Sequence, residues 1–287
     1  MALATCLLCV SACGVLTGPS RARISAPPAP LKAENVTFTS ASGSLIHAWL
    51  IRGKVGAGAV LLLHGVGSNR TSMESRAEFL HSDGFTVLAP DFQAHGESPG
   101  DHVTFGALES KDAAAAMQYL REVAPAERVG VIGVSMGGAA SVLGNGPLAA
   151  DAFVLESVYP TIRQALSNRL GTWFGPFGGL ARLLTPAAIK MLGSDAGVTE
   201  AELQPIARIG EVHAPLFILS GTADKYTPIV EAESLFAHVK SPKTFWAVDG
   251  AKHEDLHDYR PSEYERRVGA FLELNLRAPD STKAAPR

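Results

Sequence analysis

The chain has 287 residues, which is enough for one large domain carrying an insertion, since domains ordinarily run to ~100 to 200 residues. Acidic and basic residues nearly balance, with a formal net charge of -3, and the two signs are mixed along the chain. A nucleic-acid partner would call for a basic stripe or patch, so we expect none.

All three cysteines, Cys6, Cys9 and Cys13, lie in the first thirteen residues. The rest of the chain therefore has no thiol for a disulfide, a thiolate nucleophile or a cysteine metal site. Cys6 and Cys9 have the CxxC spacing of a metal site but lack a second pair of ligands. We expect no metal and no cofactor.

Residues 1–33 are interpreted as a signal segment followed by a Pro-rich linker. The apolar run MALATCLLCVSACG is too short for a membrane-spanning helix, which needs ~20 apolar residues. Within it, VSAC at residues 10–13 resembles a bacterial lipobox, in which Cys13 would carry the lipid. No Lys or Arg precedes the run, so plain secretion and a merely disordered N-terminus stay open beside the exported, membrane-anchored lipoprotein on the periplasmic or cell-surface side.

The first expected elements are two β-rich stretches, VTFTS and LIHAWLIR, joined as a hairpin through AlaSerGlySer. The apolar run AVLLLHG at 59–65 does not alternate, which is typical of a strand buried on both faces. A helix is predicted over 71–84, with Thr71 or Ser72 as its cap and Gly84 at its end.

The following segments continue an alternation of strands and helices. Strands are predicted at 85–91, 128–135, 152–157, 215–221 and 243–249, and helices at 107–123, 136–146 and 229–239. This order predicts an α/β fold whose sheet is mostly parallel, with helices on both faces.

The alternation stops between residues 158 and 209. This segment is rich in large apolar residues and glycines, and we interpret it as a helical cap over the sheet. An ordinary pair of packed helices is the alternative. Four basic residues disfavour a membrane-spanning segment: Arg163, Arg169, Arg182 and Lys190. The tail at 279–287 is predicted to be disordered.

Ser135 lies in GVSMGG, which has the pattern GxSxG between a predicted strand and a predicted helix. A serine at such a turn is held in a strained conformation that exposes its hydroxyl, and the glycines beside it make room. The alternative interpretation of GVSMGG is a turn of small residues without a catalytic role. The context favours a catalytic nucleophile.

A serine nucleophile needs a base, and the base needs an acid. His253, in GAKHED after the last predicted strand, is the expected base, with His257 as its competitor. Asp224 follows the strand PLFILS and is the expected acid. Two other carboxylates are weaker candidates, because Asp249 would cap the last strand and Asp255 would be solvated.

An oxyanion hole needs two N–H donors. Met136, directly after the serine, is predicted to supply one donor. Val66, in the loop HGVGSNR, is predicted to supply the other, because glycines on either side let this backbone approach a substrate. A flexible turn is the alternative interpretation of HGVG.

With these residues the sequence resembles the α/β-hydrolase superfamily, in its branch of serine hydrolases similar to prolyl oligopeptidases, serine aminopeptidases and monoglyceride lipases. The matching segments are LLLHGVGSN, DFQAHGES, GVSMGG, LSGTADKYTP and GAKHEDL. The resemblance implies an eight-stranded, mostly parallel sheet in a domain at 34–278, with a small helical cap inserted after the sixth strand. One departure is His95, where the family commonly has arginine or a similar residue.

The expected activity is hydrolysis of small acyl or lipid-like carboxylic esters through an acyl-enzyme, with a small-molecule ester as partner. An aminopeptidase or oligopeptidase, for which Glu156 is a candidate amine-binding residue, and a non-catalytic binder of hydrophobic ligands are the alternatives. Large apolar residues of the cap suggest an acyl or aromatic group in the substrate: Trp173, Phe174, Phe177, Leu180, Leu183 and Leu184. The sequence does not assign an oligomeric state.

Overall fold

The computed structural model describes residues 17–27 and 29–277. The lipidation candidate Cys13, the rest of the signal run and the tail at 279–287 lie outside the described residues. Among the helices within 17–27 and 29–277, none combines the length and the apolar character needed to cross a membrane.

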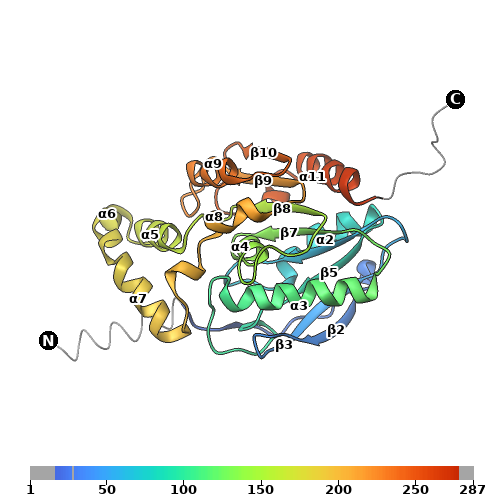
Figure 1. Ribbon diagram of the computed structural model, residues 1–287, viewed down its shortest axis with the longest axis horizontal. Coiled ribbons are helices and arrows are strands. Elements are labelled where there is room, and N and C mark those ends of the chain that lie inside the picture. Colours follow the sequence, from blue (N-terminus) through green and yellow to red (C-terminus); the bar gives the residue numbers. More distant parts are fainter. Residues whose placement is uncertain (1–16, 28, 278–287) are drawn as a thin grey trace.

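An eight-stranded sheet forms the centre of the molecule (Figure 1). Its strands are β2 (Glu34–Thr39), β3 (Leu45–Ile51), β4 (Ala59–Leu63), β5 (Thr86–Pro90), β7 (Val129–Val134), β8 (Ala152–Glu156), β9 (Leu216–Gly221) and β10 (Lys243–Val248). Their order is β10-β9-β8-β7-β4-β5-β3-β2, and only the pairs β2 with β3 and β3 with β5 are antiparallel within this sheet. The mostly parallel eight-stranded sheet and the N-terminal hairpin are confirmed.

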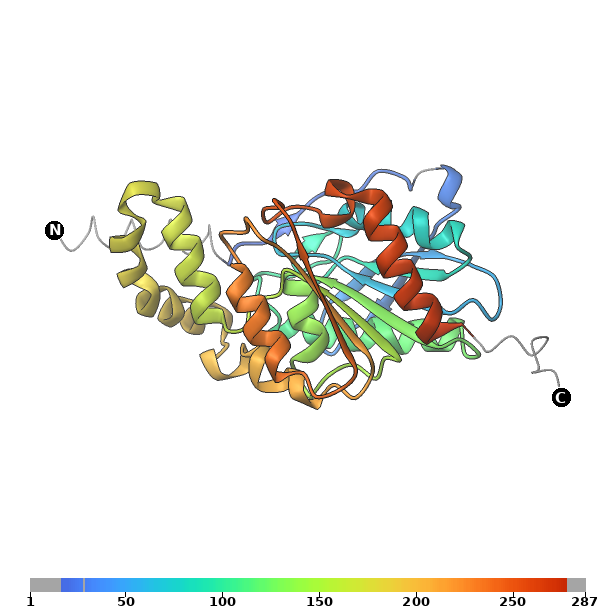
Figure 2. The same ribbon diagram turned by 90° about the horizontal axis from the view of Figure 1, so that it is seen from above.

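Helices cover both faces of this sheet (Figure 2). The α-helices of the described chain, of which α5, α6 and α7 lie beyond the sheet, are α2 (Glu74–Ser82), α3 (Ala107–Val123), α4 (Met136–Val142), α5 (Ile162–Trp173), α6 (Gly178–Ala181), α7 (Thr185–Ala196), α8 (Pro205–Arg208), α9 (Ile229–His238), α10 (Leu256–Tyr259) and α11 (Pro261–Leu276). One buried cluster joins the sheet to α3, α4 and α9, and the other joins it to α2 and α11. Because both faces are covered, every residue of β4 is buried, as the apolar run predicts.

A second, two-stranded sheet pairs β1 (Ser20–Arg21) with β6 (His95–Gly96). It places part of the predicted linker against the loop that follows β5. Two-residue strands have no hydrophobic pattern, so the sequence does not predict this pairing.

The start of the first predicted helix differs from the expectation. Asn69 caps a 3-10 turn (Arg70–Met73), and its side-chain oxygen accepts the N–H of Thr71 at 3.0 Å. The prediction of Thr71 or Ser72 as the cap is therefore wrong, since an asparagine one turn earlier satisfies this end. Gly84, at φ 94°, follows the end of α2 as predicted.

The helix after Ser135 is shorter than expected. It ends at Val142 because Leu143 is extended, with φ -86° and ψ -164°. Gly144 and Gly146 then adopt positive φ angles of 68° and 121°, which turn the chain away.

Between β8 and β9 the chain forms the helices α5 to α8, joined by 3-10 turns. Figures 1 and 2 show α5, α6 and α7 projecting from one end of the molecule. Ile162, Ala165 and Leu166 bury the inner side of α5 in the main core. The base of the projection is thereby fixed to the sheet.

Candidate active site

Ser135 forms the sharp turn between β7 and α4. Its φ of 50° and ψ of -112° are sparsely populated for a residue with a side chain, so the turn is strained. The Ser135 N–H donates to the carbonyl oxygen of Glu156 at 2.7 Å, and the Ser135 carbonyl accepts the N–H of Ala139 at 3.0 Å. These bonds hold the turn between β8 and α4.

The glycines around Ser135 are required by space. A Cβ on Gly133 would lie 2.5 Å from the Cα of Gly138. A Cβ on Gly137 would lie 2.2 Å from the carbonyl oxygen of Leu63. The pattern GxSxG therefore lets α4 pack directly on β7 and β4.

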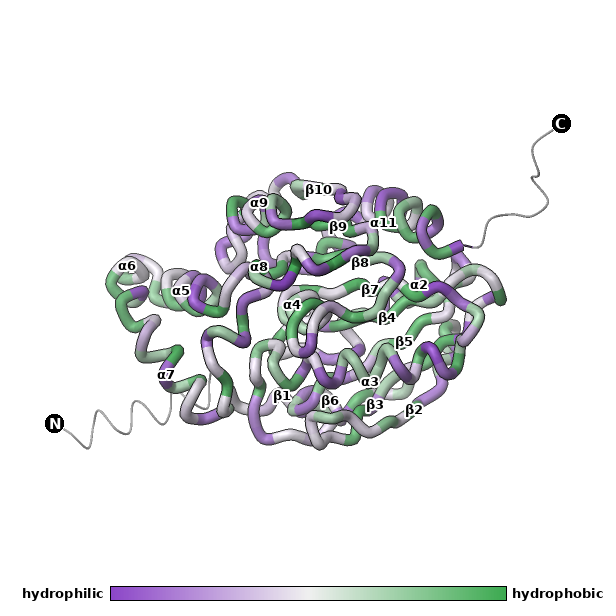
Figure 3. The backbone as a smooth tube through the Cα atoms, viewed as in Figure 1, coloured by the Kyte–Doolittle hydropathy of each residue, from purple (hydrophilic) through white to green (hydrophobic). Residues whose placement is uncertain are grey.

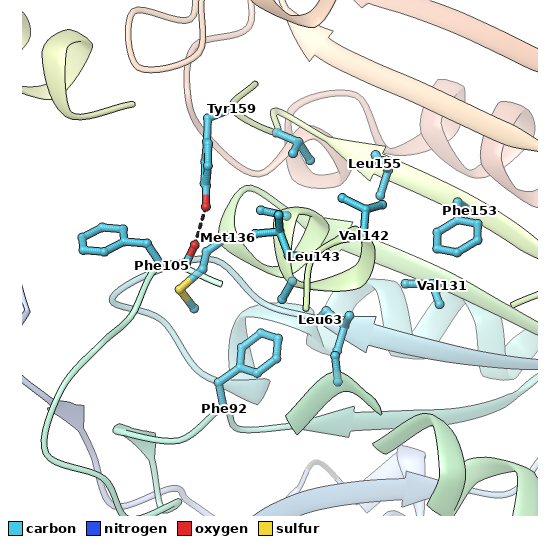
Figure 4. Packing of buried hydrophobic residues seen from close by; sticks show 14 of the residues in the cluster. Leu63, Phe92, Phe105, Val131, Met136, Val142, Leu143, Phe153, Leu155 and Tyr159 are labelled. Atoms are coloured by element: carbon cyan, nitrogen blue, oxygen red, sulfur yellow. Dashed lines mark hydrogen bonds between the residues drawn. The ribbon is translucent and has the colours of Figure 1, made fainter. Parts of the chain in front are cut away.

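Met136, the first predicted oxyanion donor, begins α4. Its side chain is buried beside Phe92 and Phe105 (Figure 4). The Tyr159 hydroxyl donates to the Phe105 carbonyl, which fixes Phe105 beside Met136. The Met136 backbone is thus anchored by its own side chain.

Asp224 and His253 are joined by a hydrogen bond of 2.7 Å between Oδ2 and Nδ1. Asp224 lies just beyond the end of β9 and His253 in the loop after β10, so neighbouring parallel strands deliver both residues. The Asp224 Oδ1 accepts the backbone N–H groups of Tyr226 and Thr227 at 2.8 and 2.9 Å. Burial opposes ionisation of Asp224, but its bonds to His253 and Thr227 outweigh burial and hold its pKa below the ordinary value.

Tyr226 and Thr227 are site residues that the sequence reasoning missed. The Thr227 hydroxyl lies 2.7 Å from Asp224 Oδ2 and 3.1 Å from His253 Nδ1. The ring centroid of Tyr226 is 5.4 Å from that of His253. Their place directly after Asp224 in LSGTADKYTP was the available signal.

Ser135 and His253 line one cavity of about 230 Å³, together with Val66. In the described chain no hydrogen bond joins the Ser135 hydroxyl to His253. Catalytic hydrogen bonds are often long without substrate and shorten when substrate binds. The cavity thus brings together the predicted nucleophile, the predicted base and the loop of the second predicted oxyanion donor.

Two histidines hold that loop. The His64 Nε2 accepts the Phe92 N–H at 3.1 Å, which leaves Nδ1–H to donate to the Gly65 carbonyl at 2.8 Å. Burial, with the neighbouring His95, lowers the pKa of His64 to about 3, so the ring is neutral. The His95 Nε2 accepts the Gly67 N–H at 3.2 Å. His95, the departure from the resemblance, therefore supports the loop.

Comparison with known proteins identifies the family. The sequence matches the model described as "Alpha/beta hydrolase family" over residues 60–267. This chain belongs to the alpha/beta hydrolase family. The predicted α/β-hydrolase fold is confirmed.

Similar proteins include other members of this fold. The uncharacterized protein YfhR of Salmonella typhi is 27% identical over 261 residues, which are 88% of this chain and 85% of YfhR. The uncharacterized protein YqkD of Bacillus subtilis is 23% identical over 75% of this chain and 70% of its own length. The esterase Pf2001 of Pyrococcus furiosus superposes with a TM-score of 0.71 at 25% identity, over 89% of this chain and 98% of Pf2001. The family and its esterase neighbours support hydrolase activity on small molecules.

The competing residues of this alpha/beta hydrolase have other partners. His257 is buried, its Nε2 lies 3.0 Å from a carboxylate oxygen of Glu265, and it does not line the cavity. Asp255 was expected to be solvated, and that prediction is wrong. Its carboxylate pairs with Arg76 at 2.5 Å and caps α10.

Glu156 is not free to bind a substrate amine. Its carboxylate pairs with Arg76 at 2.7 Å and accepts the hydroxyl of Tyr264. Both carboxylate oxygens are engaged and the residue is buried. Glu156 therefore has a structural role in this hydrolase.

The apolar cap residues do not line the cavity of this hydrolase, contrary to the expectation. They lie at the outer end of the projection with 49 to 72% of their surface exposed: Trp173, Phe174, Phe177, Leu180, Leu183 and Leu184. The cap residue that does line the cavity is Arg169 of α5. The sequence did not predict which cap residues face the cavity and which face solvent, because the break at residues 174–178 reorients the chain.

Proposed function

We propose that this protein is a serine hydrolase that cleaves carboxylic esters through Ser135, His253 and Asp224. The observation that carries the proposal is the 2.7 Å bond between His253 and Asp224 beside a cavity that His253 shares with Ser135. The strained turn at Ser135 and the esterase Pf2001 among the similar structures support it.

The reaction proceeds in two steps. Asp224 holds Nδ1 of His253, so Nε2 takes the proton of Ser135 as its oxygen attacks the ester carbonyl carbon. The N–H groups of Val66 and Met136 are the proposed donors to the oxyanion. His253 then gives the proton to the departing alcohol, leaving an acyl-enzyme. Water, deprotonated by His253, attacks this acyl group, and His253 returns the proton to the Ser135 oxygen as the acid is released.

An ester is favoured over a peptide as the substrate. A peptidase that removes terminal residues needs an acidic group for the substrate amine, and Glu156 is occupied by Arg76 and Tyr264.

Hydrolysis of matched chromogenic substrates tests this proposal. We expect the full chain to hydrolyse p-nitrophenyl esters faster than aminoacyl-p-nitroanilides, across acyl chains of increasing length. Ser135→Ala is expected to lower kcat by about 10⁴-fold or more, as loss of a catalytic serine does in other triads. Faster release from nitroanilides would overturn the ester assignment.

For the location of the enzyme we propose export and lipid attachment at Cys13, supported by VSAC in an uncharged apolar run. Metabolic labelling with an alkyne fatty acid in a bacterial host is expected to tag the full chain but not Cys13→Ser. Equal labelling of both chains would contradict it, and an unlabelled, secreted wild type would favour plain secretion.

A further inference from the structure

Arg169 is a cation in the catalytic cavity without an anionic partner. It is partly buried on α5 and lines the cavity with Ser135 and His253. No hydrogen bond or ion pair joins its guanidinium to any residue of the described chain. Its guanidinium contacts the ring of Tyr226, whose centroid is 5.7 Å from Cζ. The charge of Asp224 acts on it from farther away, without an ion pair, and that carboxylate is already bound by His253 and Thr227.

The position of the Arg169 guanidinium is energetically unfavourable unless an anion binds to it. Burial removes hydration from the guanidinium and lowers its pKa, although an arginine stays protonated in proteins. Buried charges are normally paired, because an uncompensated charge in a pocket is costly. A guanidinium is also the side chain best suited to a planar carboxylate or a phosphate.

Ser157 adds a second unsatisfied group to the same cavity. It follows β8, is 3% exposed and adopts a φ of 49°. Its buried hydroxyl has no hydrogen-bond partner in the part of the chain that the structure describes. A buried hydroxyl without a partner is destabilising, and a ligand oxygen would relieve it.

The other charged groups of the cavity do not neutralise Arg169. Arg76 is paired with Glu156 and Asp255. Glu254 is exposed, and its carboxylate accepts the N–H of Lys252 at 2.7 Å. Two charges without an ion pair in the described chain therefore line the cavity, the exposed Glu254 and the partly buried Arg169, and the arginine is the one that burial has deprived of hydration.

We propose that Arg169 and Ser157 form a subsite for a negatively charged group of the substrate. This inference rests on the proposed ester hydrolysis and narrows its substrates to esters that carry an anion. Arg169 binds the anion through its guanidinium N–H groups, and the Ser157 hydroxyl donates to the same group.

Two pairs of esters test the subsite on either side of the scissile bond. The acyl side is tested with mono-p-nitrophenyl glutarate against neutral p-nitrophenyl pentanoate. The alcohol side is tested with 4-acetoxybenzoate against its neutral methyl ester. We expect at least about tenfold higher kcat/KM for the anionic member of one pair. That pair shows whether Arg169 binds an anion on the acyl side or on the alcohol side of the scissile bond.

Variants of two arginines on α5 provide the comparison. Arg169→Gln is expected to lower kcat/KM for the preferred anionic ester by about 10- to 100-fold, mostly through KM, and to leave its neutral partner within about twofold. Arg169→Lys keeps the charge and should fall in between. Arg163→Gln is the control, because Arg163 is exposed and pairs with Glu200. It should leave both esters unchanged.

The neutral esters also separate the subsite from an indirect effect. Arg169 contacts Tyr226, which contacts His253, so a general disturbance of the base would slow neutral and anionic esters equally. Equal slowing, or no preference for either anion in the wild type, would overturn the subsite while leaving ester hydrolysis intact.

A binding measurement does not depend on turnover. Calorimetry of mono-p-nitrophenyl glutarate and 4-acetoxybenzoate is made on Ser135→Ala with and without Arg169→Gln. We expect Arg169→Gln to weaken the binding of the preferred anion at least about tenfold. Equal binding by the two variants would contradict the subsite even if the wild type hydrolyses no ester.

A different surface of the cap carries a second inference. The six exposed side chains named above, from Trp173 to Leu184, are here called the apolar tip. Green, hydrophobic segments of the tube lie around α6 and in the turn toward α7 (Figure 3). A group of large apolar side chains at the end of a projection indicates an interaction surface.

Charge around the apolar tip favours an anionic partner. Residues 162–194 contain four basic residues and no acidic residue. Arg182 and Lys190 are exposed, and neither forms an ion pair with a residue of the described chain. Aromatic and aliphatic side chains beside Lys and Arg are typical of elements that enter the interface of an anionic bilayer.

The start of the described chain lies against α7, the helix that follows the apolar tip. Thr17, the first described residue, lines a small cavity with Met191 and Leu192 of α7. The thirteen residues up to Cys13 are uncharged. We propose that the apolar tip inserts into the interface of a membrane rich in anionic lipids.

Trp173 reports insertion directly, because Trp49 and Trp246 are only 1% and 7% exposed. With the full chain, phosphatidylglycerol vesicles are expected to shift Trp173 emission to the blue, and brominated lipid to quench it. Trp173→Phe should lose both signals. Phe177→Ser with Leu183→Ser should weaken vesicle binding about tenfold or more, whereas Leu274→Ser, an exposed leucine on α11, should not.

Two results would contradict the proposal that the apolar tip inserts into a membrane. Vesicle binding without any change in Trp173 emission would place the contact elsewhere. The second result is a Trp173 emission that shifts with protein concentration in the absence of lipid. If that shift is lost in Phe177→Ser with Leu183→Ser, the apolar tip binds a second copy of the chain and not a membrane.

Discussion

At the scale of single residues, the orientation of His253 depends on the segment that follows Asp224. Tyr226 and Thr227 donate backbone N–H groups to one oxygen of Asp224, and the Thr227 hydroxyl donates to the other. Asp224 and His253 were predictable because each follows a buried strand. Thr227 was harder to predict, because its nearness to Asp224 in the sequence is only a weak signal and its role depends on the turn that folds its side chain back onto Asp224.

Replacing Thr227 tests this positioning role. Thr227→Val removes the hydroxyl but keeps the shape and the backbone N–H, so it is expected to lower kcat about tenfold with little change in KM. The pH profile of kcat should also shift, because the bonding of the His253–Asp224 pair changes. Thr244→Val, at an exposed position of the edge strand β10, is the control. A profile identical to that of the wild type would contradict the role.

Asp112 is a buried carboxyl whose titration affects stability. Burial raises its pKa from 3.8 to about 6, against hydrogen bonds from Ser40, Ser42 and Gln93. The folded chain therefore holds this proton more tightly than the unfolded chain does. The resulting stabilisation is complete below about pH 4 and is lost as the pH rises through about 6.

Denaturation by urea at several pH values measures this effect. Relative to Asp112→Asn, the free energy of unfolding of the wild type should fall by roughly 1 to 3 kcal/mol between pH 4 and pH 6.5. A difference that is constant over this range would show that folding does not shift the pKa of Asp112, and one that grows with pH would show that folding lowers it.

At the scale of elements, the hydrophobic pattern predicted the strands and α3 well, because buried strands and regular helices repeat apolar residues. It failed where a single side chain or a short pairing decides the outcome. Asn69 displaced the predicted cap of the first helix, and the pairing of Ser20–Arg21 with His95–Gly96 has too few residues to leave a pattern.

The close packing of α4 on β4 gives a prediction about Gly137. A methyl group there would meet the carbonyl oxygens of Leu63 and His64, which belong to rigid backbone. Gly137→Ala is expected to destabilise the fold by about 3 kcal/mol or more and to abolish esterase activity. Gly179→Ala is the control, since nothing lies within 4 Å of its Cβ. A Gly137→Ala enzyme of normal stability would contradict this packing.

At the scale of the whole molecule, one buried network ties four parts of the chain together. Arg76 of α2 pairs with Glu156 at the end of β8 and with Asp255, two residues after His253. Tyr264 of α11 donates to Glu156. The partners are separated by 80 to 188 positions, so no local pattern in the sequence predicts the network.

Removing the charge of Arg76 should unbalance this network. Arg76→Met leaves Glu156 buried without its cation, and we expect a loss of about 3 to 5 kcal/mol in the free energy of unfolding. Arg52→Met is the control, because Arg52 pairs with Glu34 at the surface and should contribute at most about 1 kcal/mol. Equal effects of the two substitutions would contradict a structural role for the network.

The same scale explains what was and was not predictable in the site. We could predict that Ser135, Asp224 and His253 lie close together, because each follows a strand that ends at the same edge of the sheet. Arg169 reaches this edge from α5, the first helix after β8, and the sequence pattern does not say which side of that helix faces the cavity.

Mapping of covalent modification by a fluorophosphonate tests the central claim most directly. The folded full chain is expected to gain one phosphonyl group, located by peptide mass spectrometry on Ser135. Ser135→Ala should gain none, and the wild type unfolded in urea should not react. A folded wild type that is not modified, or a label on another residue that persists in Ser135→Ala, would contradict Ser135 as the nucleophile.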